Sequence, residues 1–347
     1  MQYGIFDHLD LGDTSVSTHY RNRLDFIEAC EQAGIASYHI AEHHLTTLGM
    51  APSPNLFLSA VAQRTQRLRF GPMIFAAPLY HPLRLLEEVA MLDQMSEGRL
   101  EMGFGRGAVA AEIEFFGVDP QTADEKYQNL MNYVTDGLTH GKVTVGRKDG
   151  SQEELPLTIP TFQTPHPPLW YGQHTPPSAR KAALRGMNTL NLNTAAETRA
   201  CTDVYKATWK EQHGDAPLPR MGIGRFVVVN KDVSLARSAA QRAYKCWYDS
   251  FTYLSSRLGF SHFHHRPESF DGMVEEGRAI AGTPDMVAEY IVDQTLQAGT
   301  NYFVGQLAFG NLTRDEMLAS IGLFGQEVMP QVEQQLSRAG QTRAVAA

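Results

Sequence analysis

The sequence predicts an α/β protein in which eight parallel strands, each followed by a helix, close into one (β/α)8 TIM barrel. Short apolar runs alternate with longer segments whose apolar residues recur at helical spacing. This strand-then-helix alternation occurs eight times, and it is typical of parallel sheets with crossover helices. The length of 347 residues suits one such barrel. We therefore predict a single barrel domain over residues 1–338 and a disordered tail over 339–347.

The first four strands are predicted at residues 3–9, 35–41, 68–77 and 99–104. The first helix carries Leu24, Ile27 and Cys30 on one face and ends at Gly34. The second helix is predicted over 52–62, and the third starts at His81-Pro82 and ends at Gly98, which has the position of a helix C-cap.

An insertion is predicted after strand four. It begins with a helix through Ile113 and Phe116 and a second helix over 124–138. The polar segment 141–160 follows, and we expect it to lie over the active face of the barrel.

The remaining strands are predicted at 167–172, 189–193, 221–229 and 301–308. Helices are expected over 176–185 and 197–213, from 232 to 254, after Thr283-Pro284, and over 312–329. A His-rich loop over 262–266, after strand seven, is expected to act as a lid.

Composition excludes several classes of function. The net charge is -8, and acidic and basic residues are mixed along the chain, which gives neither a basic stripe for nucleic acid nor a polybasic membrane patch. The three cysteines, Cys30, Cys201 and Cys246, have no metal-like spacing and no even number for a disulfide framework. With no secretory signal or transmembrane run in the sequence, we expect a cytoplasmic protein.

Candidate chemistry lies at the carboxyl ends of the predicted strands, where barrel enzymes carry their active sites. Glu42, His43 and His44 follow strand two, and histidine can transfer a proton near neutral pH. Adjacent strand residues point to opposite sides, so only one of the two histidines is expected to face the site. We expect no metal there, nor at the histidines of the 262–266 loop.

A phosphate site is predicted between strands four and five. Gly105-Arg106-Gly107 would bring bare backbone and a guanidinium to the sheet edge. Thr175 is a plausible N-cap of the next helix, whose first-turn amides would join the hydroxyls of Thr175 and Ser178 around the phosphate. The alternative interpretation, a helix cap without a ligand, uses the same geometry.

Several segments, in order along nearly the whole chain, resemble the bacterial luciferase family of flavin-dependent monooxygenases, especially the luciferase α subunit. The matching segments are Glu42-His43-His44-Leu45-Thr46, Ala76-Ala77-Pro78-Leu79-Tyr80-His81-Pro82, Leu92-Asp93-Gln94-Met95-Ser96-Glu97-Gly98-Arg99, Gly105-Arg106-Gly107, Cys246-Trp247-Tyr248-Asp249-Ser250, Ala281-Gly282-Thr283-Pro284 and Leu323-Phe324 with Val328-Met329-Pro330. The resemblance implies a TIM barrel, a homodimer and reduced FMN as a diffusible co-substrate.

The resemblance also implies residue roles. His43 matches the family's catalytic histidine, and Arg106 matches its phosphate-binding arginine. The segment with His174, Thr175 and Ser178 matches the one that holds the FMN phosphate. Met73 and Ile74 occupy a position where the family often has a non-proline cis peptide against the flavin ring. Asn193 is expected beside the ring edge, and Trp247 near the flavin pocket.

The implied reaction is that of a two-component monooxygenase. A separate NAD(P)H-dependent reductase supplies reduced FMN, which reacts with O2 to give a C4a-peroxyflavin, and one oxygen atom enters a small organic substrate, with an aldehyde or ketone suspected. The alternatives are an F420-dependent oxidoreductase and a non-catalytic flavin-binding protein.

The sequence also departs from the luciferase pattern. Gly105 replaces a reactive cysteine, His174-Thr175 replaces a Glu-Ser pair, and the segment 257–283 is shorter than the luciferase mobile loop. We therefore expect a relative that emits no light, because that loop protects the oxygenated flavin from water.

Overall fold

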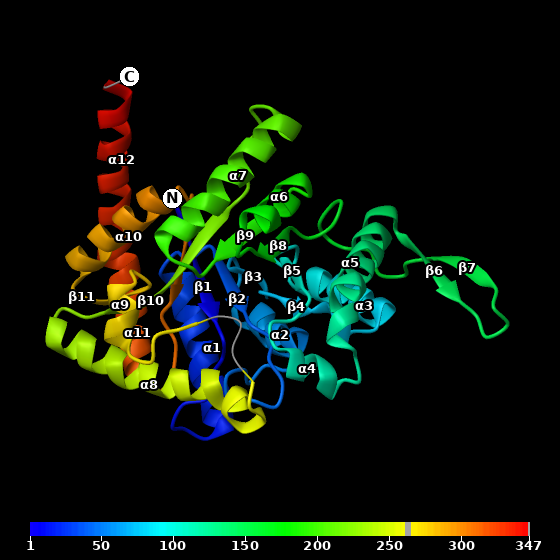
Figure 1. Cartoon of the computed structure of the whole chain (residues 1–347), viewed down its shortest axis with the longest axis horizontal. Coiled ribbons are helices and arrows are strands. Elements are labelled where there is room, and N and C mark those ends of the chain that lie inside the picture. The colour runs from blue at the N-terminus through cyan, green and yellow to red at the C-terminus, as the bar shows by residue number, and fades with distance from the viewer. Residues whose placement is uncertain (261–264, 346–347) are drawn as a thin grey trace.

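A computed structural model describes residues 1–260 and 265–345, and it confirms the predicted barrel (Figure 1). Parallel strands follow one another around the barrel in the order β3-β2-β1-β12-β10-β9-β8-β5-β4. Their bounds are β1 Gln2–Asp7, β2 Ser37–Ile40, β3 Arg69–Pro72, β4 Phe75–Ala76, β5 Met102–Gly105, β8 Leu169–Gly172, β9 Asn188–Asn191, β10 Met221–Val229 and β12 Tyr302–Gln306. Counting β3 and β4 as one interrupted strand gives eight barrel strands in the described residues.

The helices cover the outside of the barrel (Figure 1). They are α1 Val16–Gln32, α2 Pro54–Arg64, α3 Pro82–Met95, α4 Ala110–Phe115, α5 Ala123–His140, α6 Pro176–Leu184, α7 Ala195–His213, α8 Val233–Leu258, α9 Phe270–Glu275, α10 Pro284–Ala298, α11 Arg314–Leu323 and α12 Met329–Val345. Short 3-10 turns at Ala77–Leu79 and Pro120–Thr122 and a π-helical turn at Phe324–Val328 complete the assignment.

Glycines close the barrel between β3 and β5. Phe70 forms an isolated parallel bridge to Leu100. A Cβ on Gly71 would lie 2.1 Å from the carbonyl oxygen of Glu101, and a Cβ on Gly103 would lie 2.3 Å from that of Pro72. Because no side chain fits at either position, only glycine allows the two strands to approach this closely.

The insertion differs from the prediction. Within 141–160, strands β6 Lys142–Gly146 and β7 Gln152–Pro156 form an antiparallel hairpin. The hairpin projects away from the barrel beyond α5, so it does not cover the active face (Figure 1). Most of its side chains are exposed, because few apolar residues are available to pack it onto the barrel.

Two further differences concern the C-terminal half. A short strand, β11 Ala279–Gly282, extends the sheet beside the second half of β10 and was not predicted. Helix α12 continues to Val345 through most of the segment predicted as a disordered tail, while residues 346–347 lie outside the described residues. This end of the chain contains Gln, Arg and Ala, which favour helix, and no proline to end it.

In the described residues no helix has the length and apolar character needed to cross a membrane.

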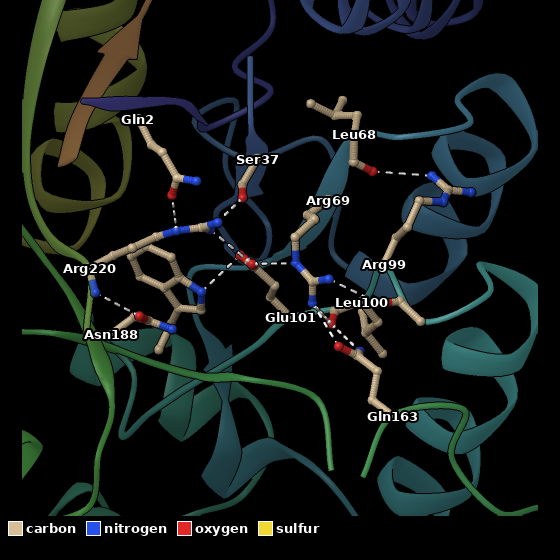
Figure 2. A network of polar contacts seen from close by, with 12 residues as sticks. Gln2, Ser37, Leu68, Arg69, Arg99, Leu100, Glu101, Gln163, Asn188 and Arg220 are labelled. Atoms are coloured by element: carbon tan, nitrogen blue, oxygen red, sulfur yellow. Dashed lines mark hydrogen bonds and ion pairs between the residues drawn. The ribbon is translucent and has the colours of Figure 1, made fainter. Parts of the chain in front are cut away.

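A buried carboxylate joins several strands at the amino-terminal end of the barrel (Figure 2). Glu101 accepts hydrogen bonds from Arg69 Nε at 2.8 Å, Arg220 at 3.1 Å and the Trp170 indole at 2.8 Å, and it is 2% exposed. This end of a barrel serves stability, since the chemistry lies at the other end.

Replacing Glu101 with Ala is expected to lower the free energy of unfolding by about 3 kcal/mol, because it leaves the buried Trp170 indole N–H without an acceptor and removes the carboxylate from two guanidinium groups. Urea denaturation measures this loss. The exposed Glu153, which pairs with Arg147 on the hairpin, provides the matched control. Its replacement with Ala should cost less than about 1 kcal/mol. Equal costs for the two variants would contradict the role assigned to Glu101.

Candidate active site

Two adjoining cavities open at the carboxyl ends of the barrel strands. The first is mostly apolar and is lined by His43, Trp247, Met73 and residues from the ends of β1, β9 and β10. The second is lined by Arg106, Thr175 and Ser178. Both share the lining residues Ile74, Gly107, Ala108, Gly172 and His174. The arrangement therefore offers a continuous site with a polar end and an apolar end.

His43 faces the apolar cavity and is held by a carboxylate. Its Nδ1 lies 3.1 Å from Glu112 Oε1, and the same oxygen accepts a hydrogen bond from the backbone N–H of His44. Burial lowers the pKa of His43, but the carboxylates of Glu112 and Glu42 outweigh burial, and the net pKa lies above its ordinary value. Since Nδ1 is engaged by Glu112, Nε2 is the nitrogen available to a ligand.

The adjacent His44 does not line the cavity, so only one of the two histidines faces it, as predicted, although both residues lie beyond the end of β2 at Ile40. Its Nε2 lies 2.9 Å from Glu42 Oε1. The second oxygen of Glu42 accepts hydrogen bonds at 2.9 Å from the Ala76 N–H and the Tyr80 hydroxyl. Glu42 therefore joins the segment after β2 to β4 and the turn that follows it. Of the two histidines, only His43 lines the cavity.

A second imidazole, His8, lies beside His43 in the apolar cavity. The two rings stack with centroids 6.0 Å apart. The Trp247 indole N–H lies 3.4 Å from His8 Nδ1, which must accept this hydrogen bond because the indole can only donate. Burial, followed by the charges of His43, Arg266 and Arg23, holds the pKa of His8 well below its ordinary value. The site therefore combines one imidazole that gains a proton readily with one that stays neutral.

The floor of the site is the segment between β3 and β4. The Met73–Ile74 peptide bond is cis, as the resemblance implied, and both residues line the apolar cavity. A Cβ on Gly105 would lie 2.9 Å from Ile74 Cγ1. The glycine that replaces the luciferase cysteine therefore makes room for the Ile74 side chain.

The polar cavity holds Arg106, Thr175 and Ser178, but the amide part of the phosphate prediction was wrong. The first two residues of α6 are Pro176 and Pro177, which have no N–H. The Ser178 N–H is directed at Thr175 Oγ1, 3.4 Å away, within a capping box. The Ser178 hydroxyl donates to the Thr175 carbonyl oxygen at 2.7 Å. The donors that remain in this cavity are the exposed Arg106 guanidinium and the hydroxyls of Thr175, Tyr127 and Tyr171, and Asp124 also lines it.

Of the two predicted residues His174 and Asn193, only His174 lines the cavities. His174 lines both cavities, and burial, followed by the charges of Arg266 and Arg106, lowers its pKa to about 4. Asn193 lines neither cavity, although its Nδ2 lies 3.4 Å from the His174 carbonyl oxygen. Leu190 and Leu192 of the same segment face the apolar cavity instead. Asn193 therefore lies outside the two cavities, and its expected place beside a ring edge stays a prediction.

The His-rich loop is only partly described. His262 and His264 lie outside the described residues, whereas His265 and Arg266 lie within them. Arg266 lines the apolar cavity. Within residues 1–260 and 265–345 no group of three or more His, Cys, Asp or Glu side chains is arranged to hold a metal ion.

The two cavities fit a flavin mononucleotide. The Arg106 guanidinium and the Thr175 hydroxyl suit a phosphate, and the apolar cavity at Met73 and Ile74 suits a planar ring. Gly107, shared by both cavities, has a φ of +88°, which favours glycine and leaves the passage between the two cavities free of a side chain.

Replacing Glu112 with Gln is expected to lower the pKa of His43, because burial is then opposed only by the weaker effect of Glu42. A ¹⁵N-histidine NMR titration measures this pKa. In the wild type, the raised pKa stabilises the fold below the ordinary histidine pKa, and that stabilisation is lost as the pH rises through the raised value. Glu114→Gln, an exposed change on the same helix, is the control. A His43 pKa that is the same in all three proteins would contradict the assignment.

Comparison with known proteins identifies the family. A sequence model described as luciferase-like monooxygenase matches residues 1–301. The chain belongs to the luciferase-like monooxygenase family. It is 35% identical, over 96% of its length and 97% of the other chain, to the uncharacterized protein y4wF of Sinorhizobium fredii. It is 26% identical to the alkanal monooxygenase alpha chain of Aliivibrio fischeri, covering 86% of this chain and 89% of that one.

Solved structures of luciferase-like proteins share the barrel. The monooxygenase RslO1 from Streptomyces bottropensis superposes with a TM-score of 0.83 at 25% identity, over 95% of this chain and 99% of that one. The oxygenating constituent of 3,6-diketocamphane monooxygenase from Pseudomonas putida, in complex with FMN, has a TM-score of 0.79 at 17% identity, over 96% and 98%. An F420-dependent secondary alcohol dehydrogenase has a TM-score of 0.68 at 18% identity, over 95% and 98%. The last two likenesses concern the fold alone.

Sequence reasoning did not select three residues that the structure brings to the site. Glu112 lies 69 positions after His43 in the chain, and nothing in the sequence pairs them. His8 falls within the predicted first strand and Arg266 within the His-rich loop, and neither position by itself indicates a site residue. Their position in the cavity follows from the closure of the barrel.

Proposed function

We propose that the protein is the oxygenase component of a two-component monooxygenase that uses reduced FMN and O2. The observation that carries the proposal is the continuous site with a phosphate-binding set at one end and His43 at the other. Related proteins of the family include the oxygenase component of a flavin-dependent trigonelline monooxygenase and a limonene 1,2-monooxygenase.

Arg106, Thr175 and Ser178 would hold the phosphate, and Met73 and Ile74 would support the ring. When bound, reduced FMN supplies two electrons to O2 and becomes oxidised FMN. One oxygen atom enters the organic substrate, an aldehyde or ketone in the first instance, and the other leaves as water.

His43 would hold or donate a proton at Nε2 beside the reacting atoms. Its Nδ1 hydrogen bond to Glu112 fixes the ring and keeps the imidazolium form available near neutral pH. The apolar side chains of Leu48, Phe251 and Leu254 exclude water from this end of the cavity.

Anaerobic titration with reduced FMN, followed by mixing with oxygenated buffer, tests the proposal. We expect saturable binding and oxidation of the bound flavin that is slower than in free solution. Oxidation at the rate of free flavin would contradict oxygenase function and favour flavin storage. Binding of reduced F420 without binding of reduced FMN would favour an F420-dependent oxidoreductase.

Four further properties belong to the proposal. From the resemblance, a separate NAD(P)H-dependent reductase would supply the reduced FMN, and the oxygenase would be a homodimer. From the sequence itself, it would be cytoplasmic, and because it departs from the luciferase pattern, it would emit no light. Strong light from reduced FMN and a long-chain aldehyde in a luminometer would contradict the last of these properties.

A further inference from the structure

A buried cation without a carboxylate partner lies at the rim of the apolar cavity. Arg266 is 9% exposed and lines this cavity. Among the described residues, its guanidinium donates one hydrogen bond, to the His265 carbonyl oxygen at 3.0 Å. A buried guanidinium is normally paired, because leaving water costs several kcal/mol.

The nearby carboxylates are engaged by another arginine. Glu276 lies 3.3 Å and Glu197 lies 3.9 Å from the guanidinium of Arg278. No described carboxylate lies within 4.0 Å of Arg266. Residues 261–264, outside the described part, are Ser, His, Phe and His, so their side chains cannot supply one either.

The neighbouring groups compensate this positive charge only in part. Burial, followed by the charge of Arg278, lowers the pKa of Arg266, while Tyr244 and the more distant Glu276 carboxylate raise it. The net pKa is about 10, which still leaves Arg266 protonated at neutral pH. Its charge contributes to the low pKa values of His8 and His174. The cavity therefore contains a buried cation near the imidazoles of His8 and His174, which stay neutral. The two carboxylates that also line this cavity, Glu42 and Glu112, are engaged by His44 and His43.

The FMN phosphate is not the natural partner of this cation. Arg266 does not line the polar cavity, where Arg106, Thr175 and Ser178 form a separate phosphate set. A single guanidinium fork matches one carboxylate in charge and geometry, whereas a phosphate dianion would leave an unpaired negative charge among apolar groups. The adjacent Trp247, Phe251 and Leu254 suit an apolar body attached to that carboxylate.

We propose that the substrate carries a carboxylate, which Arg266 binds while the apolar part of the substrate lies against Trp247, Phe251 and Leu254. This inference rests on the proposed function, because it names the substrate class of the same site. It makes Arg266 a specificity-determining residue.

Isothermal titration calorimetry on the full chain tests the proposal with three carboxylates, decanoate, 4-phenylbutyrate and benzoate, and their primary amides. We expect at least one carboxylate to bind roughly 10- to 100-fold more tightly than its amide, the preference typical of a hydrogen bond to a charged group. Arg266→Met should abolish this preference. Arg257→Met, which removes an exposed cation nearby on α8, should retain it.

The outcomes separate this proposal from others. No preference for any carboxylate, or a preference that survives Arg266→Met, would overturn it. Arg266→Met should leave the melting temperature equal or higher, since it removes an unpaired charge; if it fails to fold, Arg266→Gln serves instead. Weakened binding of reduced FMN in Arg266→Met without any carboxylate preference would assign the residue to the flavin. If the wild type prefers a carboxylate over its amide but does not bind reduced FMN, the proposed function is refuted, whereas carboxylate binding by Arg266 still stands.

Discussion

Replacement of His43 with Ala is expected to reduce turnover by about 10²- to 10⁴-fold, the range that a positioned acid or base contributes. The affinity for reduced FMN should change little, because the phosphate set lies in the other cavity. Single-turnover mixing of the reduced-flavin complex with O2 and substrate measures product formed per flavin, and the anaerobic titration measures the affinity separately.

The pH profile distinguishes a proton-transfer role for His43 from a packing role. If His43 acts as an acid, turnover in the wild type should fall as the pH rises through its raised pKa, and Glu112→Gln should move this fall to lower pH. His140→Ala, at an exposed position on α5, is the control and should leave the profile unchanged. Full turnover in His43→Ala would refute the role.

The barrel could be predicted because its strands have a strong local signature. β10 matches the predicted strand 221–229 at both ends, and all of its residues are buried. Apart from Arg225, this strand contains only apolar residues and glycine, which is the pattern of a parallel strand covered on both faces. β11 was missed because Ala279, Ile280, Ala281 and Gly282 have mostly small side chains with low strand preference. β11 pairs with β10 in a register that places Phe226 opposite Ala279. This pairing depends on the tertiary structure and has no local signal in the sequence.

The site could be predicted only where it lies at strand ends. His43 and Arg106 follow directly from the ends of strands two and four, so sequence order places them. The contact between His43 and Glu112 depends on how the barrel places α4 beside the segment after β2. Arg266 has no carboxylate partner because Glu276 pairs with Arg278 instead. Neither arrangement has a local signal in the sequence.

The phosphate prediction failed in part for a different reason. The capping pattern at Thr175 and Ser178 was interpreted as a source of free amides, but the cap itself uses the Ser178 N–H, and the two prolines before it have none. A residue that completes a helix end is not automatically free for a ligand. Arg106 therefore carries more of the proposed phosphate binding than the sequence suggested.

Arg106→Ala should accordingly weaken binding of reduced FMN by roughly 10- to 100-fold, the usual worth of a charge-assisted hydrogen bond. Reduced riboflavin, which lacks the phosphate, isolates this interaction. The wild type should prefer reduced FMN over reduced riboflavin, whereas Arg106→Ala should bind both with similar affinity. Arg147→Ala, which removes an exposed arginine from the hairpin, should keep the wild-type preference.

Salt gives a second measure of the same contact. Because Arg106 is exposed, its attraction for the phosphate is screened by ions, and the FMN preference of the wild type should fall as ionic strength rises. Arg106→Ala should lose this salt dependence, while Arg106→Lys should retain part of it, since it keeps the charge without the bidentate fork. An undiminished FMN preference in Arg106→Ala would mean that the phosphate lies elsewhere, and the flavin orientation proposed from the two cavities would then be wrong.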